Sequence, residues 1–105
     1  MRVLIVGCGY VGRPLGRCLA QQGHEVFGTR RCLDREPGFE EGAIRWLAAD
    51  VTARDTLERL PGPFDWVVNT VSAGETGVQP YRSVYLQGTQ NLLTWLQLRP
   101  PRKFI

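Results

Sequence analysis

Three glycines near the start of the chain form the first pattern that could do chemistry. They are spaced as G-x-G-x-x-G, after the apolar run 2–6 and before a stretch with helical periodicity. The first glycine permits a tight turn, the second lets a pyrophosphate approach the backbone, and the third lets the helix pack against the strand. The N–H groups and dipole of the helix start would then bind the phosphates; the alternative is a tight turn without a ligand. The residues predicted to form this site are Gly7, Gly9, Tyr10, Val11 and Gly12.

The end of the second predicted strand indicates which dinucleotide would bind. NAD-binding folds place an acidic side chain there, about twenty residues after the glycine turn, to bond the ribose 2′-hydroxyl. This sequence has Arg30 and Arg31 instead, and two guanidinium groups suit a 2′-phosphate through charge-assisted bidentate bonds. We therefore predict NADP(H). The alternative, NAD(H), would apply if the two arginines are solvated loop charges, or if Asp34 or Glu36 reaches the ribose.

Strand and helix patterns alternate along the chain, which predicts a parallel sheet with right-handed crossovers. The expected fold class is therefore α/β, a Rossmann-like doubly wound parallel sheet in one domain, residues 1–105, truncated at about the fifth strand. The expected strands are 2–6, 25–29, 44–49, 66–70 and the start of one at 103–105. The expected helices are 11–22, a short one between residue 52 and the break at Pro61, and 80–98.

Apolar spacing and capping residues predict how these helices begin and which faces they bury. Thr52 and Asp55 resemble a capping box at the start of the short helix. The three tryptophans are expected to be packing residues. The side chains predicted to face the core are Val11, Leu15, Cys18 and Leu19 in the first helix, and Tyr81, Tyr85, Leu92, Leu93 and Leu96 in the long one.

Composition excludes several classes of protein. Hydrophobic residues make up 43% of the 105 residues, which is typical of a globular chain. The net charge of +3 comes with scattered arginines, which predicts no nucleic-acid partner, and no apolar run approaches the length of a membrane span. Three cysteines without a C-x-x-C pair argue against a disulfide framework or metal site and favour the cytoplasm. The helix start could favour a thiolate at Cys8, so a redox role is a minor alternative there.

Other segments carry a family resemblance. They are Ala49-Asp50-Val51-Thr52, Val67-Val68-Asn69-Thr70 and Tyr85-x-x-Gly88-Thr89-x-Asn91-Leu92-Leu93. Together they resemble the extended short-chain dehydrogenase/reductases, the NAD(P)-dependent epimerases and dehydratases, over essentially the whole chain. The long-helix segment is the most specific, because generic Rossmann proteins lack it. The glycine turn departs from the family's common G-x-x-G-x-x-G, and its shorter form is similar to that of a less studied branch.

The resemblance implies roles for individual residues. Asp50 would bond the adenine amino group, with Val51 beside the ring, and Asn69, Thr70 and Ser72 would line the ribose and pyrophosphate. The residues themselves leave other interpretations open: Asp50 could be a helix N-cap, and Asn69 and Ser72 could make loop hydrogen bonds.

The family's catalytic residues are a Ser/Thr and a Tyr-x-x-x-Lys pair, in which the tyrosine is the general acid/base. The sequence contains no Tyr-x-x-x-Lys, and Lys103 is its only lysine. We therefore expect the NADP(H)-binding portion of an oxidoreductase or epimerase, without catalytic residues or turnover of its own. The alternative is a non-catalytic NAD(P)-sensing module. The resemblance also implies a homodimer through helix 81–98.

Overall fold

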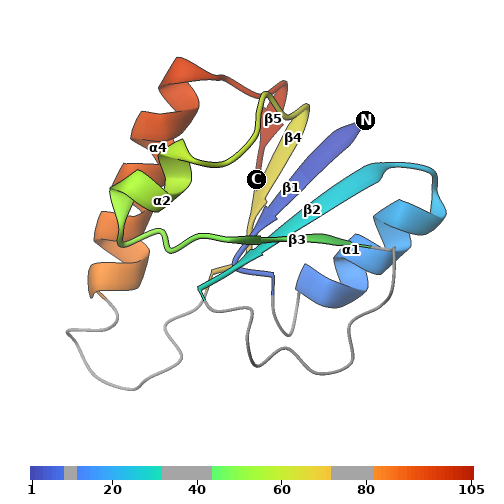
Figure 1. Cartoon of the computed structure of the whole chain (residues 1–105), viewed down its shortest axis with the longest axis horizontal. Helices are drawn as coiled ribbons and strands as arrows, with labels where there is room; N and C mark the ends of the chain where they lie inside the picture. Colours follow the sequence, from blue (N-terminus) through green and yellow to red (C-terminus); the bar gives the residue numbers. More distant parts are fainter. Residues whose placement is uncertain (9–11, 32–43, 72–81) are drawn as a thin grey trace.

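A computed structural model describes residues 1–8, 12–31, 44–71 and 82–105 (Figure 1). Five parallel strands form one sheet in the order β3-β2-β1-β4-β5, which confirms the predicted α/β Rossmann-like fold class. The strands are β1 (Arg2–Val6), β2 (Glu25–Arg30), β3 (Arg45–Ala48), β4 (Trp66–Asn69) and β5 (Lys103–Phe104). The helices are α1 (Gly12–Gln21), α2 (Arg54–Glu58), the π-helical segment η1 (Arg82–Gln87) and α4 (Gly88–Leu98).

The helices cover the sheet from both faces, with α1 on one side and α2 and α4 on the other (Figure 1). Side chains of a strand alternate between the two faces, so the central strand β1 supplies both cores. Val3 and Ile5 belong to the cluster under α1, whereas Leu4 and Val6 belong to the cluster under α2 and α4. A strand buried on both faces needs the continuous apolar run that residues 3–6 provide.

The strand order places a topological switch point beside β1. From β1 the chain builds outward to β2 and β3, then crosses to the other side of β1 for β4 and β5. Parallel strands end at the same edge of the sheet, and ligands of such folds bind at the carboxyl ends beside the switch point. The residues that follow β1, β2, β3 and β4 are therefore brought to one edge. No helix in the described part of the chain is long and apolar enough to cross a membrane.

The faces through which the helices pack match the predicted ones only in part. In α1, Leu15 and Leu19 pack against the core as predicted and are partly buried, whereas Cys18 is exposed. The fully buried residues of α1 are Gly12 and Gly16; a Cβ on Gly16 would lie 2.7 Å from Ile44 Cδ1. The first helix thus also contacts the sheet through its backbone at these glycines, a contact that apolar periodicity cannot detect. Val11 and Tyr81 lie outside the described residues.

The long helix also presents a rotated face. Leu92 and Leu96 are buried as predicted, but Leu93 is 43% exposed and Tyr85 is 38% exposed, while Trp95 is buried. Tyr85 lies in η1, and a π-helical turn holds more residues than an α-helical turn. Extrapolating a 3.6-residue period through η1 therefore misplaces its side chains.

The predicted capping box at the start of α2 is wrong. The residue before the helix is Ala53, whose backbone is extended and whose side chain makes no cap. The Thr52 hydroxyl instead donates to Asp50 Oδ1 at 2.7 Å. The loop therefore folds around the aspartate that precedes it rather than around the helix terminus.

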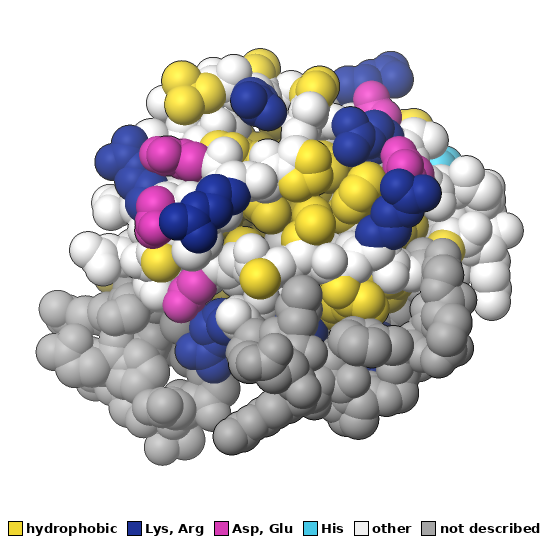
Figure 2. Space-filling view, viewed as in Figure 1, with side chains coloured by type: hydrophobic (Ala, Val, Ile, Leu, Met, Phe, Trp, Pro, Cys, Tyr) yellow, Lys and Arg dark blue, Asp and Glu magenta, His cyan; other side chains and the backbone are white. Residues whose placement is uncertain are grey.

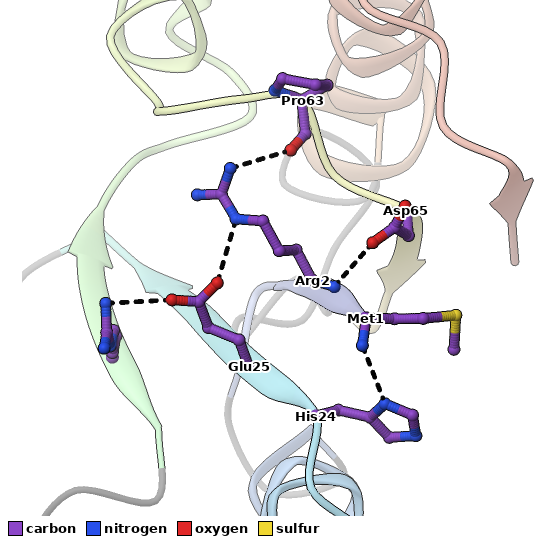
Figure 3. Close-up of polar contacts among 7 residues, drawn as sticks. Met1, Arg2, His24, Glu25, Pro63 and Asp65 are labelled. Atoms are coloured by element: carbon purple, nitrogen blue, oxygen red, sulfur yellow. Dashed lines mark hydrogen bonds and ion pairs between the residues drawn. The ribbon is translucent and has the colours of Figure 1, made fainter.

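At the amino edge of the sheet, Arg2 of β1 contacts β2 and the segment that leads into β4 (Figure 3). Its Nε donates to Glu25 Oε1 and its Nη1 donates to the Pro63 carbonyl, both at 3.2 Å. Its backbone N–H donates to Asp65 Oδ2 at 2.8 Å. This edge is thus closed by fixed polar contacts, opposite the edge at which ligands bind in such folds.

Replacing Arg2 by Met should destabilise the chain more than replacing Arg45, which contacts the same Glu25. The Arg2 guanidinium lies 5.1 and 5.4 Å from the ring centroids of Phe27 and Phe64, whereas the Arg45 side chain is 68% exposed. We expect Arg2→Met to lower the free energy of unfolding by about 1–2 kcal/mol and Arg45→Met by at most about 0.5 kcal/mol. Urea unfolding measures both, and equal losses would contradict the asymmetry.

Candidate functional site

The turn after β1 has a backbone that requires glycine at its first position. Gly7 has a φ of +71°, and a Cβ there would lie 2.5 Å from Val71 Cγ2 and 2.7 Å from Val71 Cα. At Gly12, where α1 begins, a Cβ would lie 2.9 Å from both Ile5 Cγ2 and Thr70 Oγ1. The turn and the helix start are therefore pressed against β1 and the end of β4. Gly9, Tyr10, Val11 and Ser72 lie outside the described residues.

Two threonine hydroxyls hold Gly7 from its two sides, and we call Thr29 and Thr70 the threonine clamp. Gly7 N–H donates to Thr29 Oγ1 at 2.9 Å, and the next amide, Cys8 N–H, donates to the Thr29 carbonyl at 2.7 Å. Thr70 Oγ1 lies 2.9 Å from the Gly7 carbonyl and 3.1 Å from the Val6 carbonyl, and it can donate its single proton to either. Hydroxyls from β2 and from the end of β4 thus fix the peptide groups of the turn.

The sequence interpretation missed Thr29 and gave Thr70 a different task. Thr29 is only 1% exposed, and it looks like an ordinary β-branched strand residue. The available signal was a hydroxyl side chain at the end of the strand paired with β1. Thr70 was expected to line the cofactor, but in the structure its hydroxyl proton is directed to the carbonyls of β1 and the turn.

The two arginines predicted to select the dinucleotide lie at the same edge as the turn. Arg30 is the last residue of β2 and is half-buried, and Arg31 follows it and is exposed. Arg30 also pairs in register with Ala48 of β3. A guanidinium group at the end of β2 is therefore one residue from the clamp residue Thr29.

Asp50 follows β3 and organises its own loop. Its Oδ1 accepts hydrogen bonds from the Thr52 N–H and hydroxyl at 2.9 and 2.7 Å, and its N–H donates to Thr56 Oγ1 at 2.9 Å. The alternative in which Asp50 caps α2 is wrong, because Ala53 is the residue before that helix. Within the described residues, Asp50 Oδ2 has no hydrogen-bond partner, so this oxygen could accept a bond from a ligand.

Val51 and Asn69 have local contacts of their own. The Val51 side chain is buried under α2 and α4, and its carbonyl accepts a bond from Asn91 Nδ2 at 2.9 Å. Asn91 belongs to the long-helix segment that carries the resemblance, and this bond ties the helix to the loop after β3. Asn69 Oδ1 accepts from Val71 N–H at 3.2 Å, which is the loop bonding left open as an alternative.

Cys8 is not a reactive thiol in this structure. Burial raises its pKa from 9.0 to about 11, and the positive charges of Arg13 and Arg30 only partly oppose that rise. Its side chain packs against the strand residue Gly28, where an added Cβ would meet Cys8 Cβ at 2.9 Å. The thiolate considered from the sequence is therefore disfavoured, and Cys8 acts as a small apolar packing residue.

We expect Thr29→Val to weaken the turn, whereas Thr29→Ser should preserve it. Valine has nearly the same volume but cannot accept the Gly7 N–H bond. Leaving a buried donor unsatisfied costs about 1–3 kcal/mol. Urea unfolding gives the stability, and hydrogen exchange of the Gly7 amide by NMR reports the bond itself. If the exchange rate of the Gly7 amide is unchanged in Thr29→Val, the proposed role of the Thr29 hydroxyl is contradicted.

The Cys8 thiol should make stability fall between pH 9 and 11. In that window the unfolded thiol ionises while the folded thiol keeps its proton, because its pKa is raised to about 11. The free energy of unfolding should thus drop by at most about 1.4 kcal/mol per pH unit relative to a Cys8→Ser variant. Parallel stability curves for the two proteins above pH 9 would rule this out.

Comparison with known proteins identifies a matching family and two relatives. The sequence model of the NAD dependent epimerase/dehydratase family matches residues 3–105. The chain is 29% identical over 106 residues to the photosystem II assembly factor Ycf39 of Synechocystis sp., covering 100% of this chain and 32% of that protein. It is 32% identical over 97 residues to protein YeeZ of Escherichia coli K12, covering 88% and 34%. The chain therefore spans about a third of the length of these relatives.

Solved structures share the fold. A UDP-glucose 4-epimerase from Bifidobacterium longum, in complex with NAD⁺ and UDP, superposes with a TM-score of 0.79 at 21% identity, over 99% of this chain and 36% of that one. WbmH of Bordetella bronchiseptica, in complex with NAD⁺, gives a TM-score of 0.78 at 20% identity, over 98% and 37%. With the family model matching all but the first two residues, this chain belongs to the NAD-dependent epimerase/dehydratase family.

Proposed function

We propose that this chain binds NADP(H) at the carboxyl edge of its sheet, as the cofactor-binding portion of an oxidoreductase or epimerase. The observation that carries the proposal is the position of Arg30. It ends β2 directly beside the clamped glycine turn, where an NAD-selective fold has an acidic residue. Membership of an NAD-dependent family supports a nicotinamide dinucleotide, and Arg30 with Arg31 favours the form that carries a 2′-phosphate.

We propose roles for the other predicted site residues as well. The turn of Gly7, Gly9 and Gly12, with the N–H groups of Tyr10 and Val11, would bind the pyrophosphate. Asp50 Oδ2 would accept a bond from the adenine amino group, and the backbone of Val51 would lie beside the ring. Asn69, Thr70 and Ser72 would line the ribose and pyrophosphate, with the Thr70 lone pairs as acceptors because its proton serves the turn.

The bound cofactor would supply hydride transfer, and the residues of this chain bind and orient it. The sequence has no Tyr-x-x-x-Lys, so we expect residues 1–105 to act as a binding domain without turnover. One observation favours a second candidate, a non-catalytic NAD(P)-sensing module: the relative Ycf39 is described as an assembly factor.

We propose further that two copies associate through helix 81–98. The described part of this helix exposes Leu86, Leu93 and Leu98 by 58%, 43% and 77%, and exposed apolar side chains on a helix favour packing against a partner. A nucleic-acid partner is not proposed, because basic and acidic side chains are interspersed around an apolar centre on the face shown in Figure 2. The free thiols Cys8 and Cys18 support a cytoplasmic location.

Titration with NADP⁺ and NAD⁺ in parallel tests the cofactor choice. A ligand at about 100 times its Kd should add about 2.7 kcal/mol to the free energy of unfolding, and we expect NADP⁺ to reach this effect at the lower concentration. Arg30→Asp should reverse the preference, because a carboxylate repels the 2′-phosphate and can bond a 2′-hydroxyl. Arg45→Met, which removes a positive charge at the opposite edge, serves as the control.

Stabilisation by NAD⁺ alone would retain the dinucleotide site and refute the NADP(H) assignment. Stabilisation by neither cofactor would refute the proposed function of this 105-residue chain as a whole.

A further inference from the structure

Asn91 occupies a position in α4 to which the sequence pattern assigned no role of its own. Its Nδ2 donates to the Val51 carbonyl at 2.9 Å, a bond between residues forty positions apart. Val51 belongs to residues 50–53, which follow β3 and which we call the adenine loop because of the contact proposed for Asp50. Figure 1 shows α4 beside α2, the helix into which this loop leads. A side chain of the long helix is therefore bonded to the loop that would meet the adenine ring.

The Asn91 bond acts on a peptide group that is bonded at both of its ends. In a trans peptide the carbonyl and the following N–H lie in one plane and point in opposite directions. The Val51 carbonyl accepts from Asn91, and the N–H of the same peptide, that of Thr52, donates to Asp50 Oδ1 at 2.9 Å. Rotation of this plane would break both bonds together. The Asn91 amide thus fixes the donor that holds the Asp50 carboxylate.

The contacts of Asp50 orient its second carboxylate oxygen. Oδ1 accepts from the Thr52 N–H and from the Thr52 hydroxyl, the latter at 2.7 Å. The Asp50 N–H donates to Thr56 Oγ1 at 2.9 Å, which fixes the backbone of the aspartate against α2. With Oδ1 and the backbone held, the direction of Oδ2 is set by the geometry of the adenine loop.

These local bonds shape the adenine loop, whereas Val51 places it against the helices. The Val51 side chain is 8% exposed and lies in one apolar cluster with Leu57 of α2 and Leu92 of α4. Apolar packing is not directional, so it sets the distance between the loop and α4 but leaves the peptide free to rotate. The Asn91 bond is directional and removes that freedom.

We propose that Asn91 is a positioning residue for adenine recognition: by fixing the peptide between Val51 and Thr52, it directs Asp50 Oδ2 to the adenine amino group. This inference rests on the proposed function of the same site. An ionised carboxylate only accepts hydrogen bonds, so an oriented Asp50 favours adenine over hypoxanthine, which has a carbonyl oxygen in place of the amino group. A carboxylate that turns away loses this preference, while the other contacts of the dinucleotide remain.

The test compares Asn91→Leu with Gln90→Leu, which removes an amide from the preceding, exposed position of α4. Isothermal titration calorimetry gives the Kd of each variant for NADP⁺ and for its analogue with hypoxanthine in place of adenine. We expect Asn91→Leu to weaken NADP⁺ binding about five- to tenfold and binding of the analogue less than about twofold. Gln90→Leu should keep both wild-type Kd values. If the wild-type chain binds NAD⁺ instead, NAD⁺ and its hypoxanthine analogue give the same ratio.

A double variant separates positioning from a general structural role. Asp50→Ala removes the group through which Asn91 acts, so adding Asn91→Leu to it should leave the Kd for NADP⁺ unchanged. A purely structural role of Asn91 predicts a further loss of affinity in the double variant. Far-UV circular dichroism shows whether each variant is folded. If Asn91→Leu is not, Asn91→Asp, which keeps the shape of the side chain and lacks the N–H donor, decides in its place.

The outcomes separate this inference from the function on which it rests. A wild-type chain that prefers the adenine form, with an Asn91 variant that keeps the preference, overturns the role of Asn91 and leaves the proposed function standing. Equal wild-type affinity for the adenine and hypoxanthine forms overturns this inference and the contact proposed for Asp50, but not dinucleotide binding. A chain that binds no dinucleotide overturns both. Loss of the preference in Asn91→Leu and in Asp50→Ala, with no further loss in the double variant, supports the assignment.

Discussion

The close approach of the Gly7 turn to the strands on either side of β1 is the constraint on which the site depends. A Cβ on Gly7 would lie 2.5 Å from Val71 Cγ2, so the chain leaves β1 through a space that only hydrogen can occupy. Peptide groups in such a narrow space have little access to water and need protein partners. Thr29 and Thr70 provide them, and the position of α1 follows because the helix begins five residues after Gly7.

The same close packing determines the chemistry available at the edge. Gly12, Gly16 and Gly28 lie where α1 and the sheet approach closely, and the Cys8 side chain packs beside Gly12 and Gly28. This burial keeps the thiol protonated, so the carboxyl edge offers no thiolate nucleophile at Cys8. It offers amide donors, a helix N-terminus and arginine, and these groups bind anions rather than transfer protons.

Element type and order could be predicted from the sequence because they depend on local periodicity. Residues 3–6 are apolar throughout, as a strand covered on both faces requires, and the alternation with helices specifies parallel pairing. Contacts between helices and strands were harder to predict from the sequence. The fully buried positions of α1 are glycines, the buried face of the long helix includes Trp95 and leaves Leu93 exposed, and the side chain that accepts hydrogen bonds in the loop before α2 is Asp50.

The residues of the candidate site also fall into those that the sequence could predict and those that it could not. Gly7, Gly12 and Arg30 could be singled out because their residue types are unusual at their positions in a strand–turn–helix unit. Thr29 could not, because threonine is common in strands and its role exists only once β2 lies beside β1. Asn91 is similar: it belongs to the segment that carries the family resemblance, but its bond to Val51 exists only once α4 lies beside the loop after β3. Sequence spacing therefore cannot identify residues whose role depends on a contact with a neighbouring strand or loop. In this fold such residues position the ones that spacing does identify.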